Sequence, residues 1–396
     1  MRAAGAGLAM IAVLAGSWGV WRLAPHAPPS EPVAISLTQF GDQGARALIA
    51  IEPALTPADY RSAAALEAAL ARYLDMAQGA DALNGAAVTV FPEHAGTWLV
   101  AADGQAGLYR AATVEGAMTG LALTRPVRTL AALARSGEED RIAAALFRSR
   151  GAAMARDYQQ IFSSLARRYG VTLVAGSIVL PDPNVEDGVI TVNAAGPLYN
   201  VSAVFAPDGS VHGALVRKVY PIPSEAGFTT GAPPAPQPVF DTPAGVLGVL
   251  ICADSWHGDV YDGLSQRPDL IAVPAYLQPA GVWDAPWGGY VTPWPDDAPR
   301  EDAGALTEGE AWIAHSLPRR LTAAGAEAGM TAFLRGSLWD MGADGQALAA
   351  TRDGVRLGPR TDDGAVVVLW LEGDQGLSAA LTSPAARSAA SSAPSK

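Results

Sequence analysis

The sequence predicts one α/β or α+β domain in which helices cover a sheet. Strand-like and helix-like segments alternate in a single run along the 396 residues, and no internal repeat interrupts them. Apolar residues make up 49% of the chain and charged residues 17%, which is enough for a sizeable core. The formal net charge of −12 argues against a nucleic-acid partner, because phosphate binding needs a basic face.

The N-terminus predicts a membrane anchor. Residues 3–21 carry no charge and as a helix would be about 28 Å long, close to the thickness of a bilayer core. We expect residues 1–24 to be an uncleaved anchor, with the body outside the cytoplasm on the periplasmic side. The alternative is a cleaved signal segment and a secreted protein, but the apolar run is long and no small-x-small cleavage site follows it.

The ends of the body are marked by composition. Residues 25–32 contain several prolines and predict a short, stiff linker. Residues 378–396 are mostly Ala, Ser and Pro and predict a disordered tail. The domain is therefore expected at residues 33–377.

The first half of the body reads as strands and amphipathic helices. Residues 33–38 predict a strand, and Thr56 with Pro57 predicts the start of a helix that ends at Gly79. Residues 87–91 form a nearly continuous apolar run, typical of a strand buried on both faces. Apolar positions at helical spacing then predict a long helix that ends at Gly170.

The second half is richer in strands. Residues 207–209, Pro-Asp-Gly, predict the turn of a hairpin. A further helix is expected at residues 311–328. The expected strands are residues 171–180, 199–205, 211–219, 246–251, 270–273, 330–334 and 365–371.

Three of these apolar segments end at a reactive side chain: Glu93, Lys218 and Cys252. Cys252 is the only cysteine, and Lys218 is the only lysine besides Lys396. A lone cysteine is more often an inert core residue. Strand ends are rigid, however, and neighbouring strands of a sheet bring their ends together. The three residues therefore predict one site.

The three residue types suffice for acyl transfer through a thioester. A thiol is mostly protonated near neutral pH and needs a base, and a carboxylate whose pKa is raised by an apolar pocket can accept that proton. An ammonium together with the backbone N–H after the nucleophile can stabilise the charge that develops on the substrate. This chemistry needs no cofactor and no metal.

The motifs around these residues resemble those of the nitrilase, or carbon–nitrogen hydrolase, superfamily. Glu93 lies in a "FPE" strand end, Lys218 in "RK" before an apolar residue, and Cys252 in "IC-x-D", in the family order. The flanking segments at residues 196–200, 207–209, 241–245 and 269–274 agree as well. The resemblance covers residues 33–373.

The resemblance implies a four-layer α-β-β-α sandwich and a role for each residue. Glu93 is expected to be the general base and acid, Lys218 the stabiliser of the tetrahedral intermediate, and Cys252 the nucleophile. Glu225 matches a second family glutamate that orients the lysine or helps to move protons. The backbone N–H of Ala253 is expected to complete the oxyanion site.

The residues after the nucleophile favour an amidase that acts on a small-molecule amide. Cys252-Ala253-Asp254 is closer to the amidase and carbamoylase branches than to nitrilases, which often have Trp directly after the cysteine. Two alternatives stay open: an N-acyltransferase of the lipoprotein type, and an inactive binding module on a membrane tether. Family members commonly form dimers, so a homodimer is possible.

Aromatic residues predict the substrate pocket. We expect Tyr199, Trp256, Tyr276 and Trp283 to line it, although core packing would explain such residues equally well. His257 lies close to Cys252 in sequence and offers an alternative Cys-His pair. The histidines show no metal-ligand spacing.

Residues 100–157 make the gap between Glu93 and Lys218 longer than is usual in the family. This stretch carries eight arginines against six acidic residues in a chain that is acidic overall. We expect a helical insertion that forms a lid over the active site and contacts an anionic membrane. A surface insertion without a role is the alternative.

Overall fold

The computed structural model describes residues 32–124 and 126–371. The predicted anchor, the linker up to residue 31 and the tail lie outside this part of the chain. Among the described residues, no helix combines the length and the apolar character needed to cross a bilayer. The anchor therefore stays a prediction.

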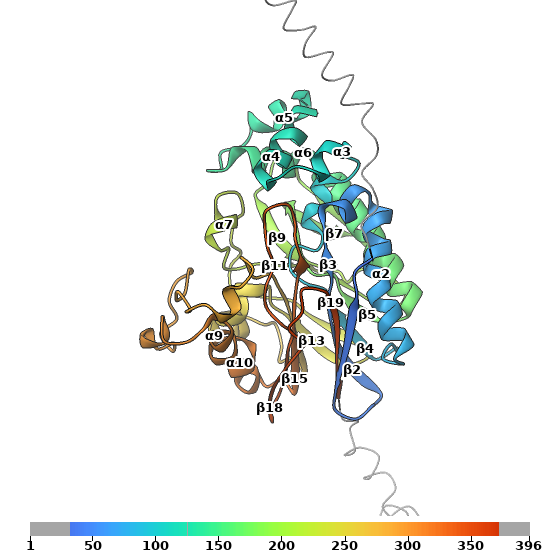
Figure 1. The fold of residues 1–396 in the computed structure, drawn as a ribbon, viewed down its shortest axis with the longest axis vertical. Coiled ribbons are helices and arrows are strands. Elements are labelled where there is room, and N and C mark those ends of the chain that lie inside the picture. The colour runs from blue at the N-terminus through green and yellow to red at the C-terminus, as the bar shows by residue number, and fades with distance from the viewer. Residues whose placement is uncertain (1–31, 125, 372–396) are drawn as a thin grey trace, which may run out of the picture.

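Two six-stranded sheets form the centre of the molecule (Figure 1). In spatial order the first sheet contains β1 (Ile35–Phe40), β19 (Gly364–Leu371), β2 (Arg46–Glu52), β4 (Ala87–Val90), β5 (Thr172–Val174) and β10 (Val204–Phe205). The second contains β12 (Val239–Thr242), β13 (Gly245–Val249), β14 (Leu270–Ala275), β15 (Ala328–Phe333), β17 (Leu348–Thr351) and β18 (Gly354–Leu357).

The two sheets pack face to face through alternating apolar side chains. In β2, Leu48 and Ala50 pack in one core cluster with Leu247 and Met330 of the second sheet. Ala47, Ile49 and Ile51, which alternate with them, belong to a different cluster on the opposite face. This alternation follows from the two-residue period of a strand. Strands buried on both faces explain the nearly unbroken apolar runs in the sequence.

Helices cover both outer faces, as Figure 1 shows, which gives the four layers that the family resemblance implied. The first sheet is covered by α2 (Ala63–Gly79) and α6 (Arg141–Tyr169). The second sheet is covered by α8 (Gly258–Asp262) and α10 (Leu317–Ala324). Gly170 ends α6 with a φ of 66°, a left-handed conformation that glycine adopts without strain.

The remaining elements are short, and α3, α4 and α5 gather at one end of the molecule in Figure 1. The helices are η1 (Pro57–Arg61), η2 (Thr97–Ala101), α3 (Ala106–Tyr109), α4 (Val114–Thr124), α5 (Pro126–Leu133), α7 (Pro223–Ala226), η3 (Cys252–Trp256), η4 (Val282–Asp284), η5 (Arg300–Asp302) and α9 (Glu308–His315). The small sheets are built from β3 (Ala54–Leu55), β6 (Ile178–Pro181), β7 (Pro183–Glu186), β8 (Val189–Val192), β9 (Leu198–Ser202), β11 (Val216–Arg217) and β16 (Arg335–Gly336).

Several expected elements need correction. Thr56 and Pro57 start the 3-10 helix η1, whereas α2 is capped by Ser62, whose hydroxyl accepts from the Ala65 N–H. The expected strand 171–180 is two strands, because Gly176 takes a φ of 64° between them. The expected helix 311–328 is two helices, α9 and α10, which are separated at Ser316. The second helix begins directly after this serine, with Leu317 and Pro318 in its first turn.

The hairpin at residues 207–209 is confirmed, with β9 and β11 antiparallel on either side of it. Only Val216–Arg217 of the expected strand 211–219 pairs as a strand, however. The sequence analysis also missed β2, which lies between β19 and β4. Two alanines in this short segment weaken its strand signal, because alanine favours helices.

Candidate active site

Glu93, Lys218 and Cys252 each follow the carboxyl end of a strand. Glu93 comes after β4, Lys218 directly after β11, and Cys252 three residues after β13. Cys252 has a φ of 50°, a left-handed conformation that costs a non-glycine residue about 1–3 kcal/mol and is concentrated at functional sites. The fold therefore holds its only thiol on a sharp turn out of the second sheet.

The lysine lies between two glutamates in a fully buried charge network. Lys218 Nζ is 2.8 Å from Glu93 Oε1 and also forms an ion pair with Glu225 Oε1. Asn200 of β9 joins the two acids, because its Nδ2 donates to Glu93 Oε1 at 2.9 Å and to Glu225 Oε2 at 3.1 Å. The structure thus brings together the four predicted side chains and adds Asn200, which the sequence analysis did not select.

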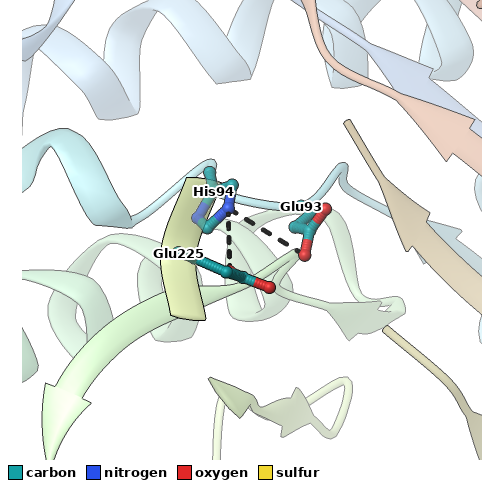
Figure 2. Close-up of side chains that lie close together, drawn as sticks. All are labelled: Glu93, His94 and Glu225. Carbon is teal, nitrogen blue, oxygen red and sulfur yellow. Dashed lines mark ion pairs between the residues drawn. The ribbon is translucent and has the colours of Figure 1, made fainter. Parts of the chain in front are cut away.

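His94 extends this network toward a cavity. Figure 2 shows its ring beside both carboxylates, and its Nε2 lies 3.5 Å from Glu225 Oε2 and 3.9 Å from Glu93 Oε1. These three residues bring ligand atoms within 4.8 Å of one another, a spacing that could hold a metal ion. Both carboxylates already bind the Lys218 ammonium, however, so we assign the cluster to the charge network and propose no metal site.

The protonation states follow from burial and from the neighbouring charges. Burial, helped by Glu93 and opposed by Lys218, raises the pKa of the Cys252 thiol well above its usual value. Burial alone would raise the pKa of Glu93 as well, but Lys218 and His94 outweigh it and lower this pKa. Burial would lower the pKa of Lys218, but Glu225 and Glu93 raise it well above its usual value.

At neutral pH the site therefore holds a thiol, an ionised Glu93 and an ammonium. This corrects the expectation that an apolar pocket raises the pKa of Glu93. A carboxylate that a neighbouring lysine keeps ionised has the chemistry of a base toward a thiol.

Asp254 ties the lysine segment to the cysteine turn. Its buried carboxyl accepts from the backbone N–H groups of Val219, at 3.0 Å, and Tyr220, at 2.9 Å. The Lys218 N–H in turn donates to the Asn200 carbonyl at 2.9 Å. Asp254 is the last residue of the "IC-x-D" motif. Its hydrogen bonds to the backbone that follows Lys218 explain why a carboxylate is useful at this position.

Two adjoining cavities open on the site. The roof cavity, about 420 Å³, is lined by Glu93, His94 and Glu225 and also by Val114, Met118, Leu146 and Phe147 from the stretch 100–157. The aromatic cavity, about 380 Å³, is lined by Cys252, Ala253, Trp256, Trp287, Tyr290, Glu308 and Trp312. Ile222, Ser224, Tyr276 and Gln278 line both cavities.

Ala253 follows the predicted nucleophile, and its backbone N–H was the expected oxyanion donor. It lines the aromatic cavity next to Cys252. Among the backbone hydrogen bonds that join described residues across loops and turns, none uses its N–H. The oxyanion role of Ala253 stays a prediction.

Of the four residues expected to line the substrate pocket, two line a cavity and two do not. Trp256 and Tyr276 line the aromatic cavity. Tyr199 lines neither cavity, because the alternation of β9 turns it away from Asn200 and places it under the Arg217 guanidinium, 4.4 Å from the ring centre. Trp283 packs edge-on against Phe333 in the core and lines neither cavity.

His257 does not pair with Cys252. Its Nε2 is 2.8 Å from the Thr292 hydroxyl, and its ring stacks on Tyr220 with the ring centres 3.8 Å apart. Burial lowers the pKa of His257 to about 4, so the ring is neutral at physiological pH. The alternative Cys-His pair is therefore wrong.

The described part of residues 100–157 is largely helical and forms one wall of the roof cavity. Its arginines are not all at the surface. Arg148 is buried, pairs with Glu138 at 2.6 Å and donates to the Gly196 carbonyl, and Arg150 is buried and donates to the Ala102 carbonyl. Part of the positive charge thus stabilises the segment itself.

Comparison with known proteins identifies the family. The sequence model of the family described as carbon-nitrogen hydrolase matches residues 47–266, more than half of the chain. The chain belongs to the carbon–nitrogen hydrolase family. It is a hydrolase that acts on carbon–nitrogen bonds. The match includes Glu93, Lys218 and Cys252. No curated protein matches the chain.

Among solved structures, the chain is similar to the nitrilase-superfamily amidase of Nesterenkonia sp. AN1. A cysteine-to-serine mutant of that amidase is 14% identical, with 83% of this chain and 92% of that chain covered and a TM-score of 0.47. The NitN amidase after tag removal is 15% identical, with 87% and 99% covered and a TM-score of 0.47. Similarity at this level has no bearing on the substrate of this chain.

Proposed function

We propose that this protein is an amidase that works through a Cys252 thioester. Glu93 accepts the thiol proton while the sulfur attacks the amide carbon. The oxyanion of the tetrahedral intermediate is stabilised by the Lys218 ammonium and the Ala253 N–H. Glu93 then returns the proton to the nitrogen, the C–N bond breaks, and ammonia or an amine leaves.

Water completes the cycle. Glu93 takes a proton from water as the oxygen attacks the thioester carbon. Glu93 then returns this proton to the sulfur as the C–S bond breaks, which releases a carboxylic acid and regenerates the thiol and the carboxylate. Glu225 and Asn200 hold Lys218 and Glu93 in place throughout. The observation that carries the proposal is the buried arrangement of the three side chains, in which Lys218 Nζ lies 2.8 Å from Glu93 Oε1 and the Glu93 carboxylate also interacts with the Cys252 thiol.

Trapping the acyl group tests this proposal. The protein is exposed to a library of small amides and its intact mass is measured. The wild type should gain an acyl mass on Cys252, and Cys252→Ala should gain none. Glu93→Gln should form the adduct at least about 100-fold more slowly, the range expected for loss of a general base. Amide turnover without Cys252 would rule out the thioester.

The two adjoining cavities also favour N-acyl transfer as a second candidate. An amine in the cavity that the leaving group vacates could resolve the thioester instead of water. Analysis of the products formed with an added amine acceptor separates the two reactions. An inactive binding module is disfavoured, because a buried network of charged side chains is costly to keep without a use.

We also propose that residues 1–24 tether this enzyme to a membrane with the catalytic domain outside the cytoplasm. The support is the uncharged apolar run in the sequence. A reporter fused after residue 30 should be active only outside the cytoplasm, and activity confined to the cytoplasm would reject this orientation.

A further inference from the structure

The aromatic cavity contains a carboxylate that the proposed mechanism does not use. Glu308 is the first residue of α9, and it is the only residue with a formal charge among those that line this cavity in the described chain. The rings of Trp256, Trp287, Tyr290 and Trp312 line the same space. The nucleophile Cys252 also faces it.

No cation of the described chain balances this carboxylate. None of the ion pairs between described residues includes Glu308, whose side chain is largely covered. Burial raises the pKa of Glu308 to about 7, although a side-chain hydrogen bond with Trp312 acts to lower it. A covered acid without a positive partner is costly, which points to a ligand that supplies the charge.

The start of α9 does not need Glu308. Thr307 and Glu310 form a complete capping box, in which the Thr307 N–H donates to Glu310 Oε2 at 2.8 Å and the Glu310 N–H donates to Thr307 Oγ1 at 3.2 Å. The acid that caps the helix is therefore the exposed Glu310. Glu308 is left facing the cavity.

The cavity walls are held rigidly relative to Glu308. The Glu308 N–H donates to the Ala285 carbonyl at 2.9 Å, and the Trp287 N–H donates to the Leu306 carbonyl at 2.8 Å, so the aromatic loop is tied to the start of α9. Trp256 stacks on Trp287 at 5.7 Å between ring centres and meets the Tyr290 ring edge-on at 5.6 Å. Ligand binding then requires little ordering of these groups.

We propose that Glu308 and these aromatic rings bind an alkylammonium group of the substrate. Aromatic faces attract cations through the ring quadrupole, and the carboxylate adds a direct charge partner. The net charge of −12 also favours cationic solutes near the protein. The inference deepens the proposed function, on which it rests for the position of the scissile bond, and it makes the preferred substrates small amides that carry a cation.

Binding without turnover tests the inference. In a Cys252→Ala background, calorimetry compares a butyramide with a terminal trimethylammonium group with its neutral tert-butyl isostere. We expect the cation to bind about tenfold more tightly. Adding Glu308→Gln should remove most of this preference, and adding Glu310→Gln, the matched control, should leave it unchanged.

Equal affinity for the two probes, or a preference that survives Glu308→Gln, would overturn the inference. If Glu308→Gln fails to fold by circular dichroism, Tyr290→Leu replaces it and should reduce the cation preference by removing one aromatic wall. These results are independent of the proposed function. A cation that binds but is never hydrolysed by the wild type would contradict amidase activity and leave the cation site intact.

Discussion

Glu93 shows how one neighbour decides the state of a buried side chain. Burial favours its protonated form, yet the Lys218 ammonium at 2.8 Å keeps it ionised. A carboxyl group whose pKa is lower in the folded than in the unfolded chain stabilises the fold above its ordinary value of 4.5, and this stabilisation is lost as the pH falls through the lowered pKa.

We therefore predict a pH-dependent stability difference between the wild type and Glu93→Gln. The wild type should be more stable at pH 7, because its carboxylate balances Lys218, and the difference should shrink below pH 4.5. Urea denaturation midpoints over a pH series measure it. Glu186→Gln, at an exposed position, should show no such trend, and a constant gap for Glu93→Gln would contradict the lowered pKa.

Gly176 holds the end of β4 close to the turn between β5 and β6. It has a φ of 64°, and a Cβ there would lie only 2.1 Å from the Pro92 carbonyl oxygen, one residue before Glu93. The backbone of the neighbouring element, and not a flexible side chain, occupies that space. Any larger residue must therefore displace the segment that carries Glu93.

We predict that Gly176→Ala lowers both stability and amide turnover. Gly188→Ala is the matched control, because Gly188 has a φ of 77° with no atom within 4 Å of the added Cβ. The control should lose about 1–2 kcal/mol from backbone strain alone and keep its activity. Thermal melts and amide turnover measure both effects, and equal losses in the two variants would refute the role of the Pro92 contact.

The elements also show what could be read from the sequence. Strand ends predicted Glu93, Lys218 and Cys252 because an apolar run that stops at a reactive residue is a local signal. Asn200 was missed, although the neighbouring Tyr199 was selected. The side chains of Tyr199 and Asn200 lie on opposite faces of β9, and the sequence of this strand does not indicate which face is turned toward the glutamates.

Long-range packing accounts for the other differences. His94 joins the network only because α7 brings Glu225 beside it, 131 positions further along the chain. The strand β2 depends on pairing with β19, whose residues come at the end of the described chain. Such contacts between distant segments leave no periodic pattern in a single sequence.

At the scale of the whole molecule, residues 100–157 supply part of the lining of the roof cavity, which the two sheets alone would lack. Met118 of α4 lines the roof cavity, whereas Leu123 of the same helix is 73% exposed. If the insertion is a lid, filling its inner face should affect bulky substrates most.

We predict that Met118→Trp lowers kcat/KM for bulky amides about tenfold or more and changes it little for the smallest ones, because the added ring occupies cavity volume. Leu123→Trp should leave both unchanged. Steady-state kinetics with amides of increasing size provide the measurement. An equal effect on all sizes would favour the alternative of a surface insertion without a role.

The four residues that line both cavities have a consequence for the order of events in turnover. Ile222, Ser224, Tyr276 and Gln278 line both spaces, so in the proposed mechanism one half of a divided substrate would depart while the other stays attached to Cys252. The vacated compartment then admits the next reactant. In the proposed mechanism, the partition between hydrolysis and transfer would be set by whichever molecule, water or amine, refills that compartment first.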